Sequence, residues 1–229
     1  LATDWIDVYY MHRDDEITPM EETLSTFARL IELGKIRYYG VSNFRSWRIA
    51  KMVEMARKMG IPPPIVCQPA YSAVTRMIET EVLPCCDHYG LGVVAYSPLA
   101  RGVLTGKYQP NVAPDASSRA GRGDRRLHQT EFRNESFAVA SALKEHALRR
   151  GFSPTQFAIA WALNNKLING VIGGPRTLEQ WQDYVAAMSV SLTAEDEAMV
   201  DGLVAPGYAS THGFTDPQYP IVGRRPRQS

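Results

Sequence analysis

The stretch WIDVYYMHRDDEITPMEETLSTFARLIELGKIRYYGV, residues 5–41, decides the fold. β-Branched and aromatic residues dominate 5–11 and again 36–41, which is typical of buried strands. Between these runs, 18–33 carries apolar side chains at helical spacing, among them Leu24 and Phe27. A strand, a helix and a second strand in this order predict a βαβ unit with parallel strands.

The same unit repeats along the chain. Further strand-like runs cover 65–68 and 92–96, and the four runs start 31, 29 and 27 residues apart. That spacing is the length of one strand plus one crossover helix. A last short strand is expected over 170–173. The sequence therefore predicts a single α/β domain over 1–229 with five parallel strands.

The segments around these strands predict helices with recognisable ends. We expect Thr18 to open a capping box with Pro19 at the first helical position, and Ser46 to cap the next helix. Pro84 is expected to interrupt a shorter helix over 77–90. The other helices are expected over 46–59, 134–150 and 154–165, with Ser153, Thr177 and Thr193 capping the last of these and the two helices after it.

Two segments interrupt the pattern. Residues 97–133 are rich in Gly, Pro, Ser and Arg, and an irregular loop of this length inside a domain is usually functional or mobile. The tail over 205–229 lacks periodicity and is expected to be a covering loop or disordered.

Composition excludes several classes of protein. The chain of 229 residues is 45% hydrophobic and 21% charged, with a formal net charge of +1, which argues against a nucleic-acid binder. Its basic stretch, 119–126, contains two glycines and reads first as a solvated loop. We expect no membrane span and no signal peptide. The three cysteines form no metal-binding pattern, so a cytoplasmic protein with reduced thiols is predicted.

Polar or aromatic residues follow each predicted strand. They are His12, then Ser42 and Asn43, then Gln68, then Tyr96 and Ser97, then the run from Gly173 to Arg176. Ligands of α/β proteins collect at the carboxyl ends of parallel strands. Neutral amides suit a carboxamide, an aromatic face suits a ring, and two glycines with an arginine before a helix suit a phosphate. Together they predict a nucleotide-like ligand.

A simpler interpretation stays open for each residue alone. Polar strand ends are often merely solvated. His12 taken by itself is better explained as a strand-end histidine bonded to backbone than as part of a site. The glycine pair matches neither a dinucleotide fingerprint nor a P-loop.

Five blocks carry a more specific signal: TDWIDVYYMH, GKIRYYGVSNF, QPAYSAVTR, VVAYSPLARGVLTGKY and GVIGGPRTLEQ. In order and spacing they resemble the aldo-keto reductases, including the branch with the potassium-channel β subunits, over about residues 1–190. The resemblance implies a (β/α)8 TIM barrel that binds NADP(H) and a small carbonyl substrate at the carboxyl ends of its strands.

The resemblance also implies roles for individual residues. His12 matches the histidine that hydrogen-bonds the substrate carbonyl, and Tyr96 the aromatic residue that stacks on the nicotinamide ring. The carboxamide would be bound by Ser42, Asn43 and Gln68. The pyrophosphate loop would include Ser97, Leu99, Gly102 and Lys107, and Arg119 lies where that loop folds over the cofactor. The adenosine and its 2′-phosphate would be held by Gly174, Arg176, Gln180 and Asp183.

The chain departs from the family pattern at three places. Tyr184 stands where the family usually has Asn, and Gly173 where many members have Pro. The strand that ends in His12 would be the fourth of eight, so only strands 4–8 are expected and the family's catalytic tyrosine, lysine and aspartate are not matched. We therefore expect a fragment of a longer enzyme or a truncated product, with an exposed edge strand at 5–11.

Three hypotheses follow. The first is an NADP(H)-dependent oxidoreductase, or part of one, that reduces aldehydes or ketones to alcohols. The second is a catalytically silent NADP(H)-binding or regulatory module of the channel-β type. The third is a truncation that does not fold stably. The substrate pocket would draw on the tail, at Tyr208, His212, Phe214 and Tyr219, and the oligomeric state is not readable.

Overall fold

The computed structural model describes residues 2–221 and residue 223, so part of the predicted tail, 222 and 224–229, lies outside the described residues, as does Leu1. The described residues group into two compact units. Unit 1 contains 2–71, 77–98 and 162–174. Unit 2 contains 72–76, 99–161 and the residues from 175 onward. Whether they form a single domain stays a prediction, and each unit is described by itself.

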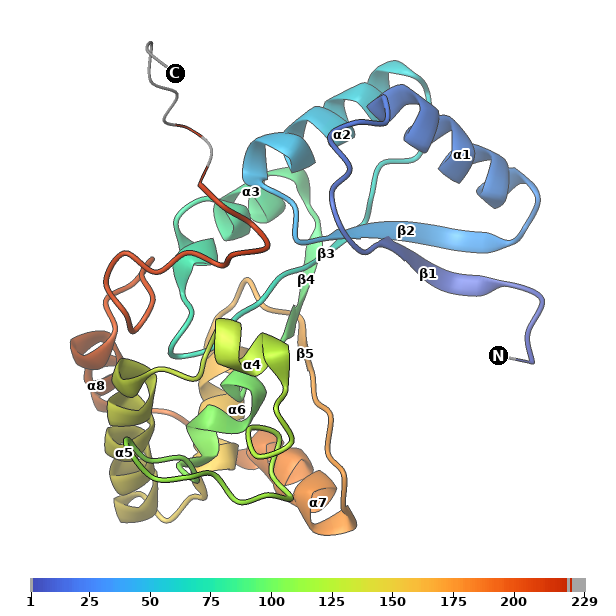
Figure 1. Ribbon diagram of the computed structural model, residues 1–229. Helices are drawn as coiled ribbons and strands as arrows, with labels where there is room; N and C mark the ends of the chain where they lie inside the picture. The colour runs from blue at the N-terminus through green and yellow to red at the C-terminus, as the bar shows by residue number, and fades with distance from the viewer. Residues whose placement is uncertain (1, 222, 224–229) are drawn as a thin grey trace. The chain divides into compact units, whose positions relative to one another are not determined.

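Unit 1 is built on a parallel sheet (Figure 1). Its described strands are β1 Ile6–Met11, β2 Ile36–Ser42, β3 Val66–Gln68, β4 Gly92–Tyr96 and β5 Gly170–Ile172. They lie in the order β1-β2-β3-β4-β5, and every neighbouring pair is parallel. The predicted α/β class and the five parallel strands are thus confirmed. Because the strands run in one direction, their carboxyl ends lie at one edge of the sheet.

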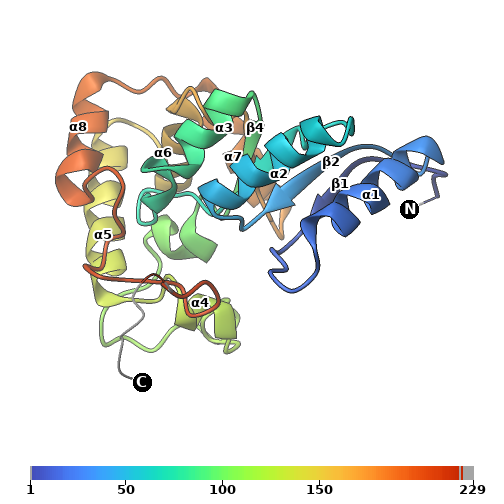
Figure 2. The same cartoon turned by 90° about the horizontal axis from the view of Figure 1, so that it is seen from above.

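Two helices cover one face of β1 and β2. They are α1 Met20–Glu32 and α2 Ser46–Lys58, and the two views agree that they lie next to each other along these strands (Figures 1 and 2). Phe27 of α1 stacks on Tyr39 of β2 with 4.3 Å between ring centroids. The Tyr39 hydroxyl donates to the Pro62 carbonyl at 2.8 Å, so this fully buried ring keeps its hydrogen bond.

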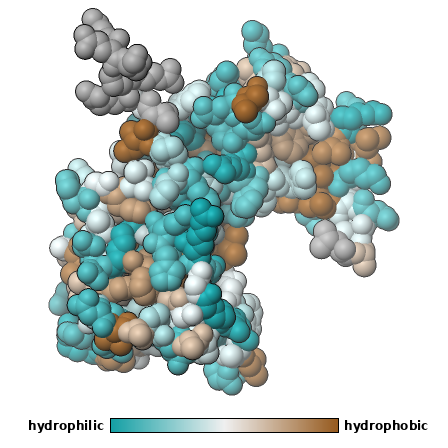
Figure 3. Space-filling view, in the orientation of Figure 1, coloured by the Kyte–Doolittle hydropathy of each residue, from teal (hydrophilic) through white to brown (hydrophobic). Residues whose placement is uncertain are grey.

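The outer side of β1 has no strand partner among the described residues. Apolar side chains reach the surface over β1 and β2 (Figure 3), where Ile6 and Val8 are only partly buried. Trp5 and Tyr38 are exposed nearby, at 41% and 52%. The expected exposed edge strand is therefore present in unit 1.

Unit 2 is helical. Its main described elements are η2 Ala100–Thr105, α4 Arg125–Gln129, α5 Asn134–Arg149, α7 Leu178–Ala186, η3 Ala187–Ser189 and α8 Ala194–Leu203. α6 Pro154–Asn164 begins in unit 2 and ends in unit 1. Asp196, fully buried at the start of α8, accepts from the His146 ring at 2.6 Å and joins α5 to α8.

Two expected helix starts and one expected helix interruption are wrong. The Thr18 hydroxyl donates to Asp15 at 2.6 Å inside a turn, so α1 starts at Met20 without a side-chain cap. Ser46 is already helical and donates to Glu81 at 2.8 Å. Pro84 does not interrupt its helix, because α3 Val82–Tyr89 starts two residues earlier and the first-turn position needs no N–H.

Other helix starts are confirmed. Ser153 and Gln156 bond each other's backbone N–H groups, and so do Thr193 and Asp196. Thr177 caps α7 through the Gln180 N–H. The expectation of an irregular 97–133 is wrong in part, because η2, α4 and the turns between them give it local structure.

Candidate functional site

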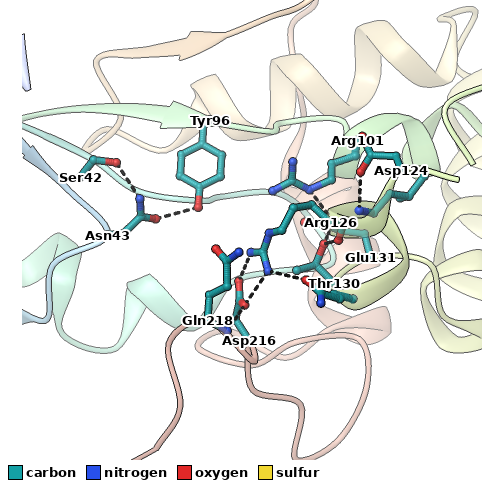
Figure 4. Close-up of polar contacts among 12 residues, drawn as sticks. Ser42, Asn43, Tyr96, Arg101, Asp124, Arg126, Thr130, Glu131, Asp216 and Gln218 are labelled. Carbon is teal, nitrogen blue, oxygen red and sulfur yellow. Dashed lines mark hydrogen bonds and ion pairs between the residues drawn. The ribbon is translucent and has the colours of Figure 1, made fainter. Parts of the chain in front are cut away.

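Unit 1 gathers polar groups at the carboxyl ends of β1, β2, β3 and β4. The Asn43 Nδ2 donates to the His12 backbone carbonyl at 3.1 Å and to the Ser42 Oγ at 2.9 Å. The Tyr96 hydroxyl donates to the Asn43 Oδ1 at 2.8 Å (Figure 4). The Ser42 Oγ donates to the Gln68 backbone carbonyl at 2.8 Å. We name these five residues the strand-end cluster.

The local backbone explains how these side chains converge. Asn43 and Ser97 directly follow β2 and β4, and both have a φ of 59°. Asparagine tolerates this left-handed conformation better than most residues do. The turn at Asn43 directs its amide back toward the edge of the sheet rather than along the strand.

Tyr10 of β1 contacts this cluster through Gln68. The Gln68 side chain hydrogen-bonds the Tyr10 hydroxyl, and burial raises the pKa of Tyr10 while that hydrogen bond lowers it less. Tyr10 lies in β1, two residues before His12, which follows the strand, and an extended chain would place both side chains on the same side. That period-two spacing was the signal available in the sequence for finding Tyr10.

The loop after His12 is held by a nearly buried ion pair. The Arg48 guanidinium donates to both carboxylate oxygens of Asp14, with distances of 2.7 to 3.1 Å, and to the Asp15 carbonyl at 3.2 Å. The side chains are only 9% and 12% exposed. His12 itself is exposed, so its ring is open to solvent while its carbonyl belongs to the cluster.

The residues predicted to contact a pyrophosphate lie around η2 in unit 2, except Ser97, which is in unit 1. Leu99 is buried, and its carbonyl accepts the N–H groups of Gly102 and Leu104. Gly102 has a φ of 95°, and a Cβ there would lie 3.2 Å from the Nζ of Lys107. The glycine thus permits both the turn and the close approach of the lysine.

The same segment contains a set of ion pairs that no motif in the sequence indicates (Figure 4). The Arg101 Nε lies 3.0 Å from the Glu131 Oε2, and the Thr130 hydroxyl also donates to Glu131. Burial raises the pKa of Glu131, and the positive charge of Arg101 opposes that rise only in part. Arg101 has a φ of 54° beside Gly102, a strained conformation held in place by this contact.

Further ion pairs fix the segment locally. The Arg119 Nε lies 2.6 Å from the Asp124 Oδ2, so Arg119 is engaged within its own loop. Arg126 of α4 binds both carboxylate oxygens of Asp216 at 3.1 and 2.6 Å, which ties the tail to α4. The sequence offered no spacing signal for this pair, because its members lie 90 residues apart.

The residues predicted to hold an adenosine phosphate divide between the units. Gly174 is exposed and belongs to unit 1. In unit 2 the Gln180 Oε1 accepts the Arg176 N–H at 2.7 Å. The Asp183 carboxylate accepts from the Ser153 hydroxyl at 2.8 Å and from the Gln156 amide at 2.8 Å. Asp183 therefore already joins α7 to the start of α6.

The predicted tail residues lie in irregular segments of unit 2. The Tyr208 carbonyl accepts the Arg76 N–H at 2.9 Å. The Phe214 ring lies under the Arg133 guanidinium, at 3.7 Å. His212 is exposed, and the Tyr219 N–H donates to the Asp216 carbonyl.

The structure thus brings together His12, Ser42, Asn43, Gln68 and Tyr96, and their roles stay predictions. Within the residues that the structure describes, no group of side chains could hold a metal ion, and no helix is long and apolar enough to cross a membrane. The three cysteines are free thiols.

Comparison with known proteins gives a consistent result. The model of the aldo/keto reductase family matches residues 1–205. Over 210 residues the chain is 33% identical to L-glyceraldehyde 3-phosphate reductase of Escherichia coli strain K12, covering 90% of this chain and 60% of that protein.

Two other relatives come from eukaryotes. Identity is 37% over 196 residues to aflatoxin B1 aldehyde reductase member 2 of Homo sapiens, with 80% of this chain and 54% of that protein covered. Identity is 35% over 191 residues to a probable voltage-gated potassium channel subunit beta of Oryza sativa subsp. japonica, with 83% and 58% covered. The chain thus spans between half and two thirds of the length of these relatives.

Proposed function

Because the chain belongs to the aldo/keto reductase family, we propose that it is part of an NADP(H)-dependent oxidoreductase that reduces aldehydes or ketones to alcohols. The observation that carries this proposal is the strand-end cluster. It combines a flat ring, a side-chain amide and a hydroxyl at adjacent strand ends, beside an exposed histidine.

The cluster fits a nicotinamide. A carboxamide NH₂ needs acceptors, and both the Asn43 Oδ1 and the Ser42 Oγ keep a lone pair after their internal hydrogen bonds. The Tyr96 ring is partly exposed and supplies a face for stacking. When bound, the cofactor supplies the hydride for the reaction.

His12 is proposed to orient the substrate. Its exposed ring can donate a hydrogen bond to a carbonyl oxygen, and the Arg48–Asp14 pair restricts the loop that follows it. This role requires a fixed position and a donor nitrogen, and no change in protonation.

The preference for NADP(H) over NAD(H) is proposed from Arg176. Its side chain is exposed, and no acidic group in the described part of the chain pairs with it. Gln180 binds the Arg176 backbone and leaves the guanidinium available for a 2′-phosphate. Arg176→Ala should weaken binding of NADPH at least tenfold while NADH changes little, which a paired titration measures.

We further propose that the sheet of unit 1 forms strands four to eight of a (β/α)8 barrel. All neighbouring strands are parallel and follow chain order, as the strands of such a barrel do. A cytoplasmic location also stays a prediction, in keeping with free thiols.

Two measurements test the function. NADPH fluorescence on titration with the chain reports binding, and aldehyde-dependent loss of NADPH absorbance reports turnover. Binding with turnover supports the oxidoreductase. Binding without turnover of any aldehyde or ketone supports the alternative, a silent NADP(H)-binding module. Absence of binding by folded protein rejects both.

A further inference from the structure

The Asn43 amide has no donor left for a ligand. A primary amide carries two N–H protons, and those of Asn43 go to the His12 carbonyl and to the Ser42 Oγ. The His12 carbonyl can only accept a hydrogen bond, so the Asn43 amide must direct its nitrogen toward it. The Asn43 amide can therefore form one more hydrogen bond, by accepting it at the remaining lone pair of Oδ1.

Tyr96 reinforces the same orientation from the other end of the amide. Its hydroxyl lies 2.8 Å from the Asn43 Oδ1 (Figure 4) and donates to it, because a carbonyl oxygen cannot donate. If the amide were rotated by 180°, the Oδ1 would face the His12 carbonyl and the Tyr96 hydroxyl would face an N–H group.

The Ser42 hydroxyl, like the Asn43 amide, has no donor left for a ligand. Its hydroxyl proton goes to the Gln68 carbonyl at 2.8 Å, and one lone pair accepts the Asn43 N–H. The hydroxyl is buried with only 1% of the residue exposed, so its rotor is held by these two bonds. Neither Ser42 nor Asn43 therefore has a hydrogen-bond donor left for a ligand.

We propose that the Tyr96 hydroxyl is a positioning group that fixes the Asn43 amide as an acceptor, and that this subsite selects ligands with a hydrogen-bond donor. A carboxamide NH₂ satisfies it, whereas a methyl ketone or a carboxylate at the same position leaves the acceptors unpaired or repelled. This inference rests on the proposed function, because it takes the ligand to be the nicotinamide end of NADP(H).

The test compares two oxidised ligands that differ in one group. NADP⁺ carries the carboxamide, and its 3-acetylpyridine analogue has a methyl group in place of the NH₂. Calorimetric titration of the full chain should give a dissociation constant about fivefold or more lower for NADP⁺. In Tyr96→Phe, which keeps the ring, that ratio should fall to about twofold or less.

Tyr39→Phe is the matched control. It also removes one tyrosine hydroxyl with a 2.8 Å hydrogen bond, but that bond goes to Pro62, in the connection between α2 and β3. The ratio of the two dissociation constants should stay at the value of the unmodified chain. A purely structural role of Tyr96 would change both affinities equally and leave the ratio unchanged.

The outcomes separate the two proposals. Failure of the unmodified chain to bind NADP⁺ overturns the proposed function and this inference with it. Binding without discrimination between the two ligands overturns the inference alone, and needs no variant. Discrimination that survives in Tyr96→Phe shows that the His12 carbonyl suffices and overturns the role of Tyr96.

Discussion

The ion pair between Arg48 and Asp14 should hold the loop after His12 more strongly than a surface pair could. The guanidinium makes a forked contact with the carboxylate, and both side chains are close to buried, at 9% and 12% exposure. Arg48→Met keeps the length and apolar stem of the side chain but leaves Asp14 without its partner.

The expected cost is about 3 kcal/mol, because removal of one member of a buried pair leaves an uncompensated charge. The same sheet supplies a control. Arg37 and Asp7 are also 2.8 Å apart, but their side chains are 57% and 69% exposed. Arg37→Met should cost less than about 1 kcal/mol, because water screens an exposed pair.

Native-state hydrogen exchange of the β1 and β2 amides measures this cost within unit 1, so that unfolding of unit 2 does not enter. Each arginine variant is combined with Asp14→Ala or Asp7→Ala in a double-mutant cycle. The coupling energy between Arg48 and Asp14 should exceed that between Arg37 and Asp7 by at least about 1.5 kcal/mol. Equal coupling energies would refute the argument from burial.

Three further predictions concern other contacts. Asp196→Ala should lower the free energy of unfolding by about 3 to 5 kcal/mol in urea titration, and Glu195→Ala, an exposed acid in the same turn, by less than about 1 kcal/mol. For Asp216, burial opposes ionisation, but hydrogen bonds from α4 and from Gln218 outweigh it and lower the pKa. The Asp216 carboxylate therefore stabilises the tail fully above about pH 4, and this stabilisation is lost as the pH falls through the lowered pKa. Hydrogen exchange of the tail amides, corrected for the intrinsic pH dependence of exchange, should accelerate below pH 4 and be independent of pH from 5 to 7. Gly40→Ala should cost about 1 to 3 kcal/mol in thermal unfolding, because its Cβ would lie 2.6 Å from a Val66 methyl group, whereas Gly202→Ala meets nothing within 4 Å and should be neutral or stabilising.

The strands could be predicted from sequence because each is a short apolar run of limited length. Their bounds differ from the predicted ranges by at most one residue at either end, as at 65–68, where β3 starts at Val66. Helix starts were harder to predict. Thr18 and Ser46 are typical caps, yet Asp15 and Glu81 compete for their hydroxyl groups. Such a competition depends on which segments meet, and no local pattern contains it.

The candidate site could be predicted as a set of positions but not as a set of contacts. Parallel strands require that His12, Asn43, Gln68 and Tyr96 share one edge of the sheet. The hydrogen bond from Tyr96 to Asn43 spans 53 residues of sequence, and its donor is the hydroxyl of a ring assigned to stacking. Nothing in the spacing of the motifs indicates that the hydroxyl has a partner.

Sheet register connects these contacts to the fold. Ser42 is the register partner of Gln68, which places its hydroxyl against the Gln68 carbonyl. The Tyr96 N–H donates to the Pro69 carbonyl at 2.9 Å, so β4 is aligned with the chain just beyond β3. A shift of either strand by one residue would turn each side chain to the opposite face. Two alignments, of β2 with β3 and of β4 with the chain after β3, therefore bring these groups together. With the left-handed conformation of Asn43 at the end of β2, they determine that the subsite accepts hydrogen bonds.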